Sequence, residues 1–273
     1  MSNNIFFERG QMADKPNNYL LLGDCLELMK EIPDKSMNAI ICDLPYGTTA
    51  CKWDSVIPFE PLWEQYKRII KDNGAIVLFG SQPFTSALIM SNPKDFKYEW
   101  IWQKTKGSNF QTLKHQPWKM HENILVFNAK GVYNPQKYTV SEDKIDKRKN
   151  VNDPLTNKEG VYGKLKRTRK KDDGTRFPDS VQKFKNPNNN SLHPTQKPLK
   201  LLKYLVKTYT NENDWVLDNT CGSNTTGIAC YDLNRNYIGI EKNEDIYNVA
   251  KKRVEKNILL RANEQQTLFQ NKP

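Results

Sequence analysis

Short apolar runs alternate with segments expected to be helical along this chain, and that alternation limits the possible folds more than any other feature. Runs suited to buried strands occupy residues 19–22, 39–42, 75–79, 98–102, 124–127, 215–217 and 237–240. Segments with a helical character occupy residues 25–32, 61–71, 84–90, 199–208, 225–233 and 246–258. Apolar strands joined by helices build parallel sheets that are covered on both faces. The pattern therefore predicts an α/β fold with a doubly wound, mostly parallel sheet.

Local signals set two of the expected element ends. Asn73-Gly74 follows the segment 61–71 and is a good signal for the carboxyl end of a helix. The tail 261–273 is polar, and we expect it to fray beyond the last helix.

A basic stretch interrupts the alternation between the two halves of the sheet. Residues 131–190 contain 15 Lys and Arg against 8 Asp and Glu, a net charge of +7 out of +11 for the whole chain of 273 residues. We therefore predict a catalytic and cofactor-binding domain formed by residues 1–130 and 191–273, with 131–190 as an inserted segment. Clustered positive charge favours a polyanionic partner such as nucleic acid, although a flexible, solvated loop has the same composition.

The first strand-end motif lies where the strand 215–217 ends. Asp218 is followed by a turn of small residues that opens the next helix, and this turn contains Gly222, Ser223 and Thr225. Glycine lets a ligand approach the backbone closely, and a helix amino terminus offers free N–H groups to a carboxylate or phosphate. The Gly-Lys-Ser/Thr sequence of a P-loop is missing, which disfavours an NTPase. An ordinary strand-to-helix turn is the alternative.

The second candidate is an acid at the end of the next strand. Glu241 follows residues 237–240, 23 positions after Asp218. A carboxylate at that distance accepts the hydroxyls of a ribose in dinucleotide-binding folds. Together the two features indicate a cofactor with a nucleoside and a charged tail, whereas a solvated glutamate is the simpler interpretation of Glu241 alone.

The third strand-end motif is Asp43-Leu44-Pro45-Tyr46, which directly follows the strand 39–42. Pro45 biases Leu44 towards an extended conformation, so the Leu44 carbonyl and the Asp43 carboxylate can face one amino group. An exocyclic amino group of a base is a poor nucleophile, and two acceptors on its hydrogens would draw its nitrogen towards sp³ geometry. Tyr46 offers a flat face to a ring. A proline turn with a packed tyrosine is the alternative.

Composition excludes several classes of protein. The five cysteines include no C-x-x-C pair, and the three histidines are scattered, so we expect reduced thiols, a cytoplasmic location and no metal site. We expect no signal peptide at the amino terminus. We also expect no membrane span, because no apolar run approaches the ~18 residues that a span requires.

These motifs resemble those of the S-adenosylmethionine-dependent DNA methyltransferases that methylate amino groups. Their signature is Asp/Asn/Ser-Pro-Pro-Tyr/Phe/Trp, with a cofactor motif of the form Asp-Pro-Phe-x-Gly-Ser-Gly-Thr-Thr. Here the catalytic-type motif precedes the hexapeptide His193-Pro194-Thr195-Gln196-Lys197-Pro198 and the cofactor motif. That circularly permuted order is similar to the beta group of the family. It implies a seven-stranded sheet and a target-recognition segment at 131–190.

The resemblance also implies roles for single residues. Asp43 and the Leu44 carbonyl would hold the target amino group, with Pro45 fixing the loop and Tyr46 stacking on a base flipped out of the duplex. The cofactor would be bound by a second set of residues. Its methionine end would meet Asp218, Gly222, Ser223 and Thr225, its ribose Glu241, its adenine Asp24 and its carboxylate region Thr195 and Lys197. His121-Glu122 would precede the strand that borders the base pocket.

Three departures from the family pattern bear on these roles. Leu44 replaces the first proline, but only its carbonyl is needed. Asn219 and Thr220 replace Pro-Phe, which removes an aromatic wall near the cofactor. Asn224 replaces a glycine, and asparagine tolerates positive φ better than most residues.

The resemblance implies methyl transfer from S-adenosylmethionine to the 6-amino group of adenine in a specific sequence of double-stranded DNA. The Asp-first motif favours adenine. The 4-amino group of cytosine, an RNA substrate and a non-catalytic DNA-binding regulator on the same scaffold are the alternatives. Relatives are often dimeric or paired with a restriction endonuclease, so a homodimer and a restriction-modification partner are further expectations.

Two groups of residues are candidates for DNA contact. The basic run within the insertion would meet phosphates, which sets affinity more than sequence specificity. Its members are Lys164, Lys166, Arg167, Arg169, Lys170 and Lys171. The basic segment 104–119 carries Phe110 and Trp118, either of which would serve as a wedge or stacking residue near a flipped base; packing of Trp118 in the core is the alternative.

Overall fold

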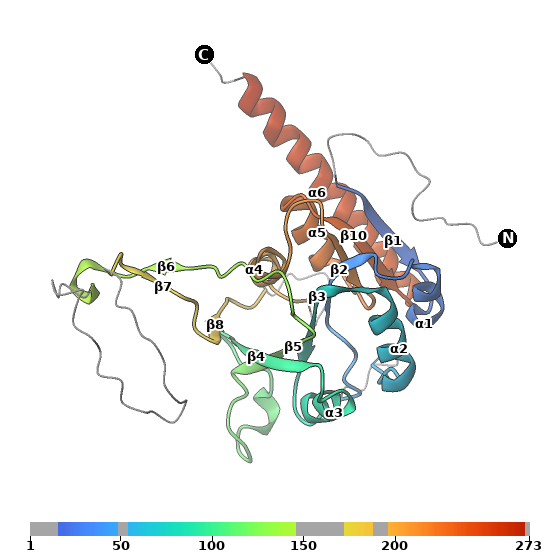
Figure 1. Cartoon of the computed structure of the whole chain (residues 1–273), viewed down its shortest axis with the longest axis horizontal. Coiled ribbons are helices and arrows are strands. Elements are labelled where there is room, and N and C mark those ends of the chain that lie inside the picture. The colour runs from blue at the N-terminus through green and yellow to red at the C-terminus, as the bar shows by residue number, and fades with distance from the viewer. Residues whose placement is uncertain (1–15, 49–53, 146–171, 188–195, 271–273) are drawn as a thin grey trace. The chain divides into compact units, whose positions relative to one another are not determined.

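The protein is described from a computed structural model of the whole chain (Figure 1). The structure describes residues 16–48, 54–145, 172–187 and 196–270, with side chains up to residue 257. The chain divides into two compact units. One consists of Met1–Asn134 and Ser180–Pro273, and the other of Pro135–Asp179.

The larger unit is built on a twisted sheet of apolar strands. In the described residues this sheet has eight strands in the order β1-β10-β9-β2-β3-β5-β4-β8. The strands are β1 (Asn18–Leu22), β2 (Met37–Cys42), β3 (Ile70–Gly80), β4 (Phe96–Gln103), β5 (His121–Phe127), β8 (Val181–Lys183), β9 (Trp215–Asp218) and β10 (Asn236–Glu241). Pairing is parallel from β1 to β3, and β5 runs antiparallel to both of its neighbours. The prediction of a doubly wound, mostly parallel sheet is confirmed.

Strand β8 is the difference from the expected seven-stranded sheet. Its three residues pair in parallel with β4 through Ile101–Val181 and the two following positions. This segment falls within 131–190 and carries one apolar residue, so no strand pattern marks it in the sequence. It forms because β4 presents an open edge, whose backbone groups gain partners by pairing.

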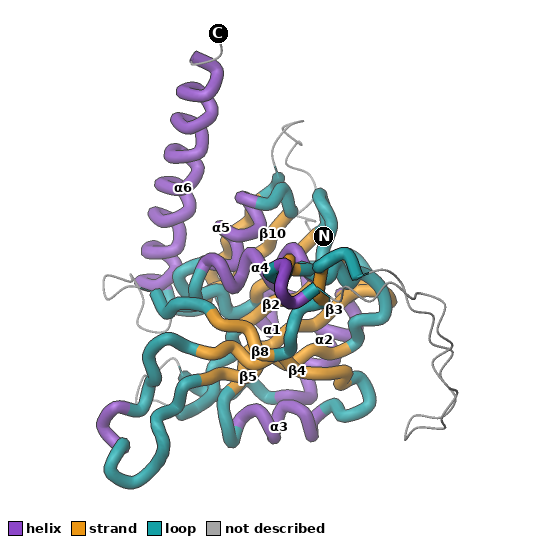
Figure 2. The backbone as a smooth tube through the Cα atoms, turned by 90° about the vertical axis from the view of Figure 1, so that its left-hand side faces the viewer, coloured by secondary structure: helices purple, strands orange, loops and turns teal. Residues whose placement is uncertain are grey.

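Helices cover both faces of the sheet (Figure 2). Helices α1 (Cys25–Leu28), α2 (Phe59–Ile69) and α3 (Phe84–Ser91) share one apolar core with the sheet, and α4 (Leu199–Tyr209) and α5 (Thr225–Asp232) share the other. Successive strand residues alternate between the two cores: Ile40 belongs to the first and Ile41 to the second. In the described part of the chain, no helix is both long and apolar enough to cross a membrane.

The end of α2 corrects one sequence-based expectation. The helix ends at Ile69, not at Asn73-Gly74, and β3 begins at once with Ile70. Ile70 is extended, buried and paired with Met37, while the next pairing joins Ala39 to Ala75. Asn73-Gly74 therefore lies in a bulge of the strand. Burial of Ile70 in the core outweighs the local turn signal.

The last helix corrects a second expectation. Helix α6 (Glu244–Gln270) continues far beyond the expected end at residue 258, and Figure 1 shows it as one uninterrupted red helix. Residues 259–270 contain no glycine or proline, so nothing in the sequence stops the helix. The polar composition of this tail does not prevent it from forming a helix.

The smaller unit contains little regular structure in its described residues. Strands β6 (Tyr138–Thr139) and β7 (Thr175–Arg176) form an antiparallel pair, with a 3₁₀ turn at Glu142–Lys144. Arg176 forms an ion pair of 2.7 Å with Asp172. The basic run lies outside the described residues.

Candidate functional site

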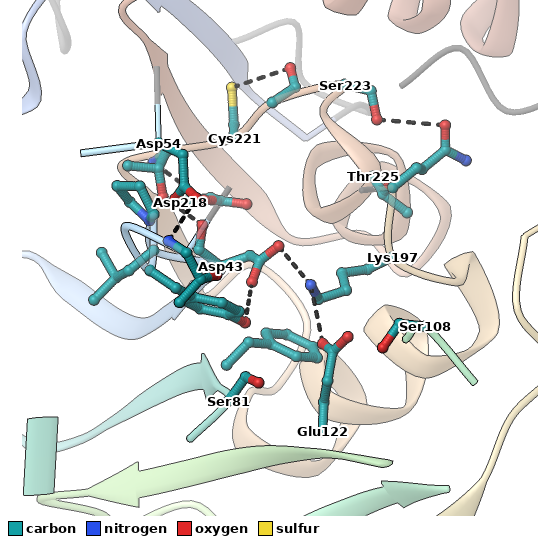
Figure 3. Close-up of a pocket in the computed structure, with 18 of the residues that line it drawn as sticks. Asp43, Asp54, Ser81, Ser108, Glu122, Lys197, Asp218, Cys221, Ser223 and Thr225 are labelled. Carbon is teal, nitrogen blue, oxygen red and sulfur yellow. Dashed lines mark hydrogen bonds and ion pairs between the residues drawn. The ribbon is translucent and has the colours of Figure 1, made fainter. Parts of the chain in front are cut away.

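A cavity of about 1350 Å³ opens in the larger unit where β2, β9 and β10 end. Its lining includes both Asp43-Leu44-Pro45-Tyr46 and the turn from Asp218 to Thr225, as Figure 3 shows in part. Pockets for one small ligand usually measure about 300–1000 Å³. The volume therefore leaves room for two ligands next to each other.

The loop after β2 presents its acid to this cavity and anchors itself in the core. Leu44 is buried in the first apolar core, whereas Asp43 and Tyr46 are partly exposed. The Tyr46 hydroxyl donates a hydrogen bond of 2.6 Å to Asp43 Oδ1. Burial, followed by the charge of Asp43, raises the pKa of Tyr46 well above its usual value, so the tyrosine remains a donor.

A second carboxylate fixes the far end of the same loop. Asp54 accepts hydrogen bonds of 2.9 Å from the backbone N–H groups of Gly47 and Thr48, one on each oxygen. Gly47 has a φ of +67°, which favours glycine at this turn. The loop is thus tied down on both sides of the Asp43–Tyr46 motif.

Lys197 lies beside Asp43. Its ammonium is 2.6 Å from Asp43 Oδ2 and 3.1 Å from Glu122 Oε2. Figure 3 shows both carboxylates pointing at this nitrogen. The ion pairs of Lys197 in the described structure are therefore with Asp43 and Glu122, and the cofactor-side role expected for this residue stays a prediction.

The turn after β9 has the conformation that a closely approaching ligand needs. Gly222 has a φ of +53°, and a Cβ placed on it would have no atom within 4 Å. Asn224 takes the left-handed conformation with φ 60°, which confirms that asparagine can stand in for glycine here. Gly227 has no such room: an added Cβ would collide with Asn224 and lie 2.7 Å from the Tyr237 ring. This glycine allows α5 to pack against β10.

Asp218 is a buried acid at the start of this turn. It is almost fully buried, and its Oδ1 accepts a hydrogen bond of 3.3 Å from the Thr220 N–H. Burial raises the pKa of Asp218 to about 7, opposed by hydrogen bonds from Thr226 and Thr220. An acid whose pKa lies near 7 is partly ionised at neutral pH, and its ionised form can bind a cation in the cavity.

Glu241 closes the other side of the turn. Its carboxylate accepts the N–H groups of Gly222 at 3.0 Å and Asn243 at 2.8 Å, and burial raises its pKa. Asp24 lines the same cavity and caps α1 by accepting the Leu26 N–H. The structure thus brings Asp24, Glu241, Asp218 and Asp43 together around one cavity.

Asn219 and Thr220, which replace the Pro-Phe of the family pattern, join the turn after β9 to neighbouring elements. Thr220 Oγ1 donates a hydrogen bond of 3.0 Å to the Asp43 carbonyl, and it lies 2.9 Å from Cys42 Sγ. Asn219 accepts a hydrogen bond of 2.6 Å from the buried Tyr66 hydroxyl. The departure from the pattern therefore adds polar ties between the turn, β2 and α2.

Sequence reasoning missed Arg253, which supports the turn from α6. Its Nη1 donates to the Ser223 carbonyl at 2.7 Å and to Thr225 Oγ1 at 2.8 Å. Burial lowers the pKa of this guanidinium below its usual value. No strand-end signal marks an arginine inside a helix, so only the fold reveals this contact. Sequence reasoning also missed Lys104, which pairs with Glu122.

The candidates for DNA contact differ in what the structure says of them. Phe110 lies in the 3₁₀ turn Phe110–Thr112 with 76% of its surface exposed. Trp118 is also exposed and lines the cavity, with its indole packed on Gly107. The basic run and Thr195 lie outside the described residues. Within those residues, no cluster of acids, histidines and cysteines has the make-up of a metal site.

The α/β fold of the larger unit is that of the S-adenosylmethionine-dependent methyltransferases. The crystal structure of the M1.HpyAVI–SAM complex matches it with a TM-score of 0.56 and 26% identity, over 86% of this chain and 98% of that chain. The sequence pattern of the DNA methylase family, which groups N6 and N4 methyltransferases, matches residues 37–252. The chain belongs to this DNA methylase family.

Named relatives agree with that assignment. The type II methyltransferase M.HpaI of Haemophilus parainfluenzae is 28% identical over 253 residues, covering 86% of this chain and 74% of the relative. The DNA adenine methyltransferase YhdJ of Escherichia coli (strain K12) is 29% identical over 257 residues, covering 86% and 82%. Both similarities extend over most of each chain.

Proposed function

We propose that this protein transfers a methyl group from S-adenosylmethionine to the 6-amino group of adenine within a specific sequence of double-stranded DNA. One observation carries the proposal: the Asp43 motif and the turn from Asp218 to Thr225 line a single cavity large enough for two ligands. The adenine preference is supported by the Asp-first motif and by the name of the relative YhdJ.

The cofactor half fits S-adenosylmethionine in shape and charge. Gly222 leaves open space that a Cβ would fill, and Asp218 offers a buried carboxylate to a cationic group. Asp218, Gly222, Ser223 and Thr225 would hold the methionine end, Glu241 the ribose and Asp24 the adenine. Thr195 belongs to the same proposal. The cofactor supplies an electrophilic methyl group, and the protein supplies the positions.

The target half fits an amino group that has to be made nucleophilic. Asp43 and the Leu44 carbonyl would accept its two hydrogens, while Tyr46 would stack on the ring. Pro45 holds the two acceptors in place. The rate gain would come from orientation and from fixed charges.

The DNA-binding half of the proposal rests on the exposed aromatic residues and the basic insertion. Phe110 and Trp118 lie within the segment 104–119, which carries lysines and contributes to the cavity wall. A base must leave the duplex to reach Asp43, and an exposed aromatic ring is suited to fill the space it leaves. We propose residues 131–190 as the inserted target-recognition segment, with 1–130 and 191–273 as the catalytic and cofactor-binding domain.

Replacement of Asp43 by alanine tests the chemistry. The Asp43→Ala variant should lose methyl transfer from labelled cofactor to DNA, yet bind the cofactor with nearly unchanged affinity. Asp34→Ala is the matched control, because Asp34 is an exposed acid that lies before β2, whereas Asp43 follows β2. Substantial transfer by Asp43→Ala would remove the role assigned to this carboxylate.

Methylation-sensitive sequencing of DNA from cells that express the protein tests the substrate. Methylated adenine in one recurring sequence supports the proposal, and methylation at the cytosine 4-amino group would replace it. A location in the cytoplasm, a homodimer and a companion restriction endonuclease belong to the same proposal. Light scattering of the purified protein checks the dimer.

A further inference from the structure

Four buried or partly buried side chains of alternating charge form a chain along the side of the cavity that holds Asp43. Asp43 pairs with Lys197 at 2.6 Å, Lys197 with Glu122 at 3.1 Å, and Glu122 with Lys104 at 2.5 Å. We call these four residues the charge chain. Figure 3 shows two of its members, Asp43 and Glu122, converging on the ammonium of a third, Lys197.

The charge chain is electrically neutral as a whole. Exposed fractions of the side chains are 26% for Asp43, 10% for Lys197, 13% for Glu122 and 7% for Lys104. Charges removed from water this far are tolerated only with close partners of opposite sign. Loss of any single member leaves one uncompensated charge, whereas loss of a neighbouring pair restores neutrality.

Lys197 is confined by more than its two acids. Its ammonium lies 5.1 Å from the centre of the Phe79 ring and 5.9 Å from that of Tyr46. Burial alone would lower the pKa of Lys197, but Asp43 and Glu122 raise it above its usual value. The ammonium is therefore charged at neutral pH and fixed in place.

Both oxygens of Asp43 are held in one orientation. Tyr46 donates to Oδ1 and Lys197 to Oδ2, each at 2.6 Å. Burial raises the pKa of the Asp43 carboxyl, the Lys197 ammonium opposes that rise, and Glu122 adds to it. Each carboxylate oxygen has a second lone pair, so acceptor capacity remains for an amino group.

Other titratable groups face this carboxylate from neighbouring elements. Asp218 at the end of β9 and the Cys42 thiol at the end of β2 interact with its charge. Burial raises the pKa of Cys42 well above its usual value, so this thiol stays neutral. Lys197 is the one cation in the described residues that contacts the Asp43 carboxylate directly.

We propose that Lys197 is a positioning residue for the transfer reaction: it keeps the Asp43 carboxylate ionised and oriented towards the target amino group. The Lys104–Glu122 pair in turn holds Lys197 in place. This inference rests on the proposed function, because it assigns Lys197 to the target half of that same site. The ionised carboxylate is the form that can accept hydrogens from the amino group, so its protonation would abolish its role.

Charge compensation by a second substitution separates this role from a merely structural one. Lys197→Met should lower kcat for methyl transfer by about 100-fold at pH 7.5, with partial recovery as the pH rises towards 9.5. Adding Glu122→Gln removes the unbalanced negative charge. The double variant should have a kcat at pH 7.5 at least tenfold higher than that of Lys197→Met alone. Lys35→Met, which breaks an exposed pair with Asp72, is the matched control and should behave as the wild type.

Cofactor affinity distinguishes the two roles considered for Lys197. Titration calorimetry with S-adenosylmethionine should give a Kd for Lys197→Met within about threefold of the wild type. A large loss of affinity with unchanged kcat at saturating cofactor would overturn the positioning role and leave the proposed function intact. A wild-type protein without methyl transfer would refute the proposed function instead.

A direct titration of Asp43 decides the inference without reference to activity. Carbon-13 NMR of labelled aspartate carboxyls, with the Asp43 signal identified by its loss in Asp43→Asn, follows the charge itself. The titration midpoint of Asp43 should rise in Lys197→Met and fall back when Glu122→Gln is added. An Asp43 midpoint that is the same in all these proteins would refute the role of Lys197, whatever the transfer rates.

Discussion

Replacement of Asp218 by asparagine should stabilise the cofactor-free protein while it weakens cofactor binding. The side chain is almost fully buried, and burial raises its pKa from 3.8 to about 7. Between these pH values the unfolded chain releases the proton and the folded protein keeps it. The free energy of unfolding of the wild type should therefore fall as the pH rises from about 4 to 7, and change little from this source above 7.

The size of the effect follows from that pKa. Each pKa unit corresponds to about 1.4 kcal/mol, so the charged form of Asp218 costs the fold about 4 kcal/mol at pH 8 and roughly 2–3 kcal/mol less at pH 5. Asparagine keeps an oxygen for the Thr220 N–H and carries no charge. The stabilisation by Asp218→Asn should accordingly be about 2–3 kcal/mol larger at pH 8 than at pH 5.

Urea unfolding at the two pH values, without cofactor, measures this difference. Asp34→Asn is the control, because its carboxylate is exposed and its ion pair with Arg68 contributes little. The same stabilisation by Asp218→Asn at pH 5 and pH 8, or destabilisation at pH 8, would refute the argument. For the wild type, the affinity for S-adenosylmethionine should increase between pH 6 and 8, because the ionised acid binds the cationic cofactor.

Three other variants, one with four substitutions and two with one each, test separate parts of the molecule. Neutralising Lys166, Arg167, Arg169 and Lys170 should weaken DNA binding. It should also reduce the slope of log affinity against log salt concentration by up to about four units. An unchanged slope would remove the basic run from the interface. Phe110→Ala should slow methylation of duplex DNA much more than that of DNA with a mismatched target base, as parallel rate assays would show, with no effect on cofactor affinity. Gly227→Ala should lower the free energy of unfolding by about 1–3 kcal/mol in urea, because its Cβ meets Tyr237 across the α5–β10 contact; Ala229→Gly in the same helix is a useful comparison.

The order of strands and helices could be predicted from the sequence because it depends on apolar patterning. Strand ends carry recognisable residues, so the amino-acid pattern alone identifies Asp43, Asp218 and Glu241, and all three line one cavity. The conformation of Asn224 was predictable for a similar reason, since few residues tolerate positive φ.

Other features depend on contacts between distant segments, which patterning does not contain. Lys197 lies 154 positions from Asp43, and Arg253 approaches the turn after β9 from a helix. The end of α2 differs from the expectation because Ile70 is buried and pairs with Met37 of β2, more than 30 positions away. Local signals therefore identify the candidate residues at strand ends, while the residues that contact and support them are revealed only by the packing.

The Thr220 hydroxyl links the site proposed for the cofactor to the site proposed for the target base. It joins the turn that would hold the cofactor to the Asp43 carbonyl, which belongs to the peptide group between Asp43 and Leu44. A small displacement of that turn on cofactor binding would shift this peptide group, which lies between the two proposed acceptors, the Asp43 carboxylate and the Leu44 carbonyl. Coupling of this kind is reciprocal. A base bound at Asp43 would raise the affinity for the cofactor by the same factor by which the cofactor raises the affinity for the base. One threonine at a position where the family carries an aromatic residue would thus couple the affinity for each substrate to the presence of the other.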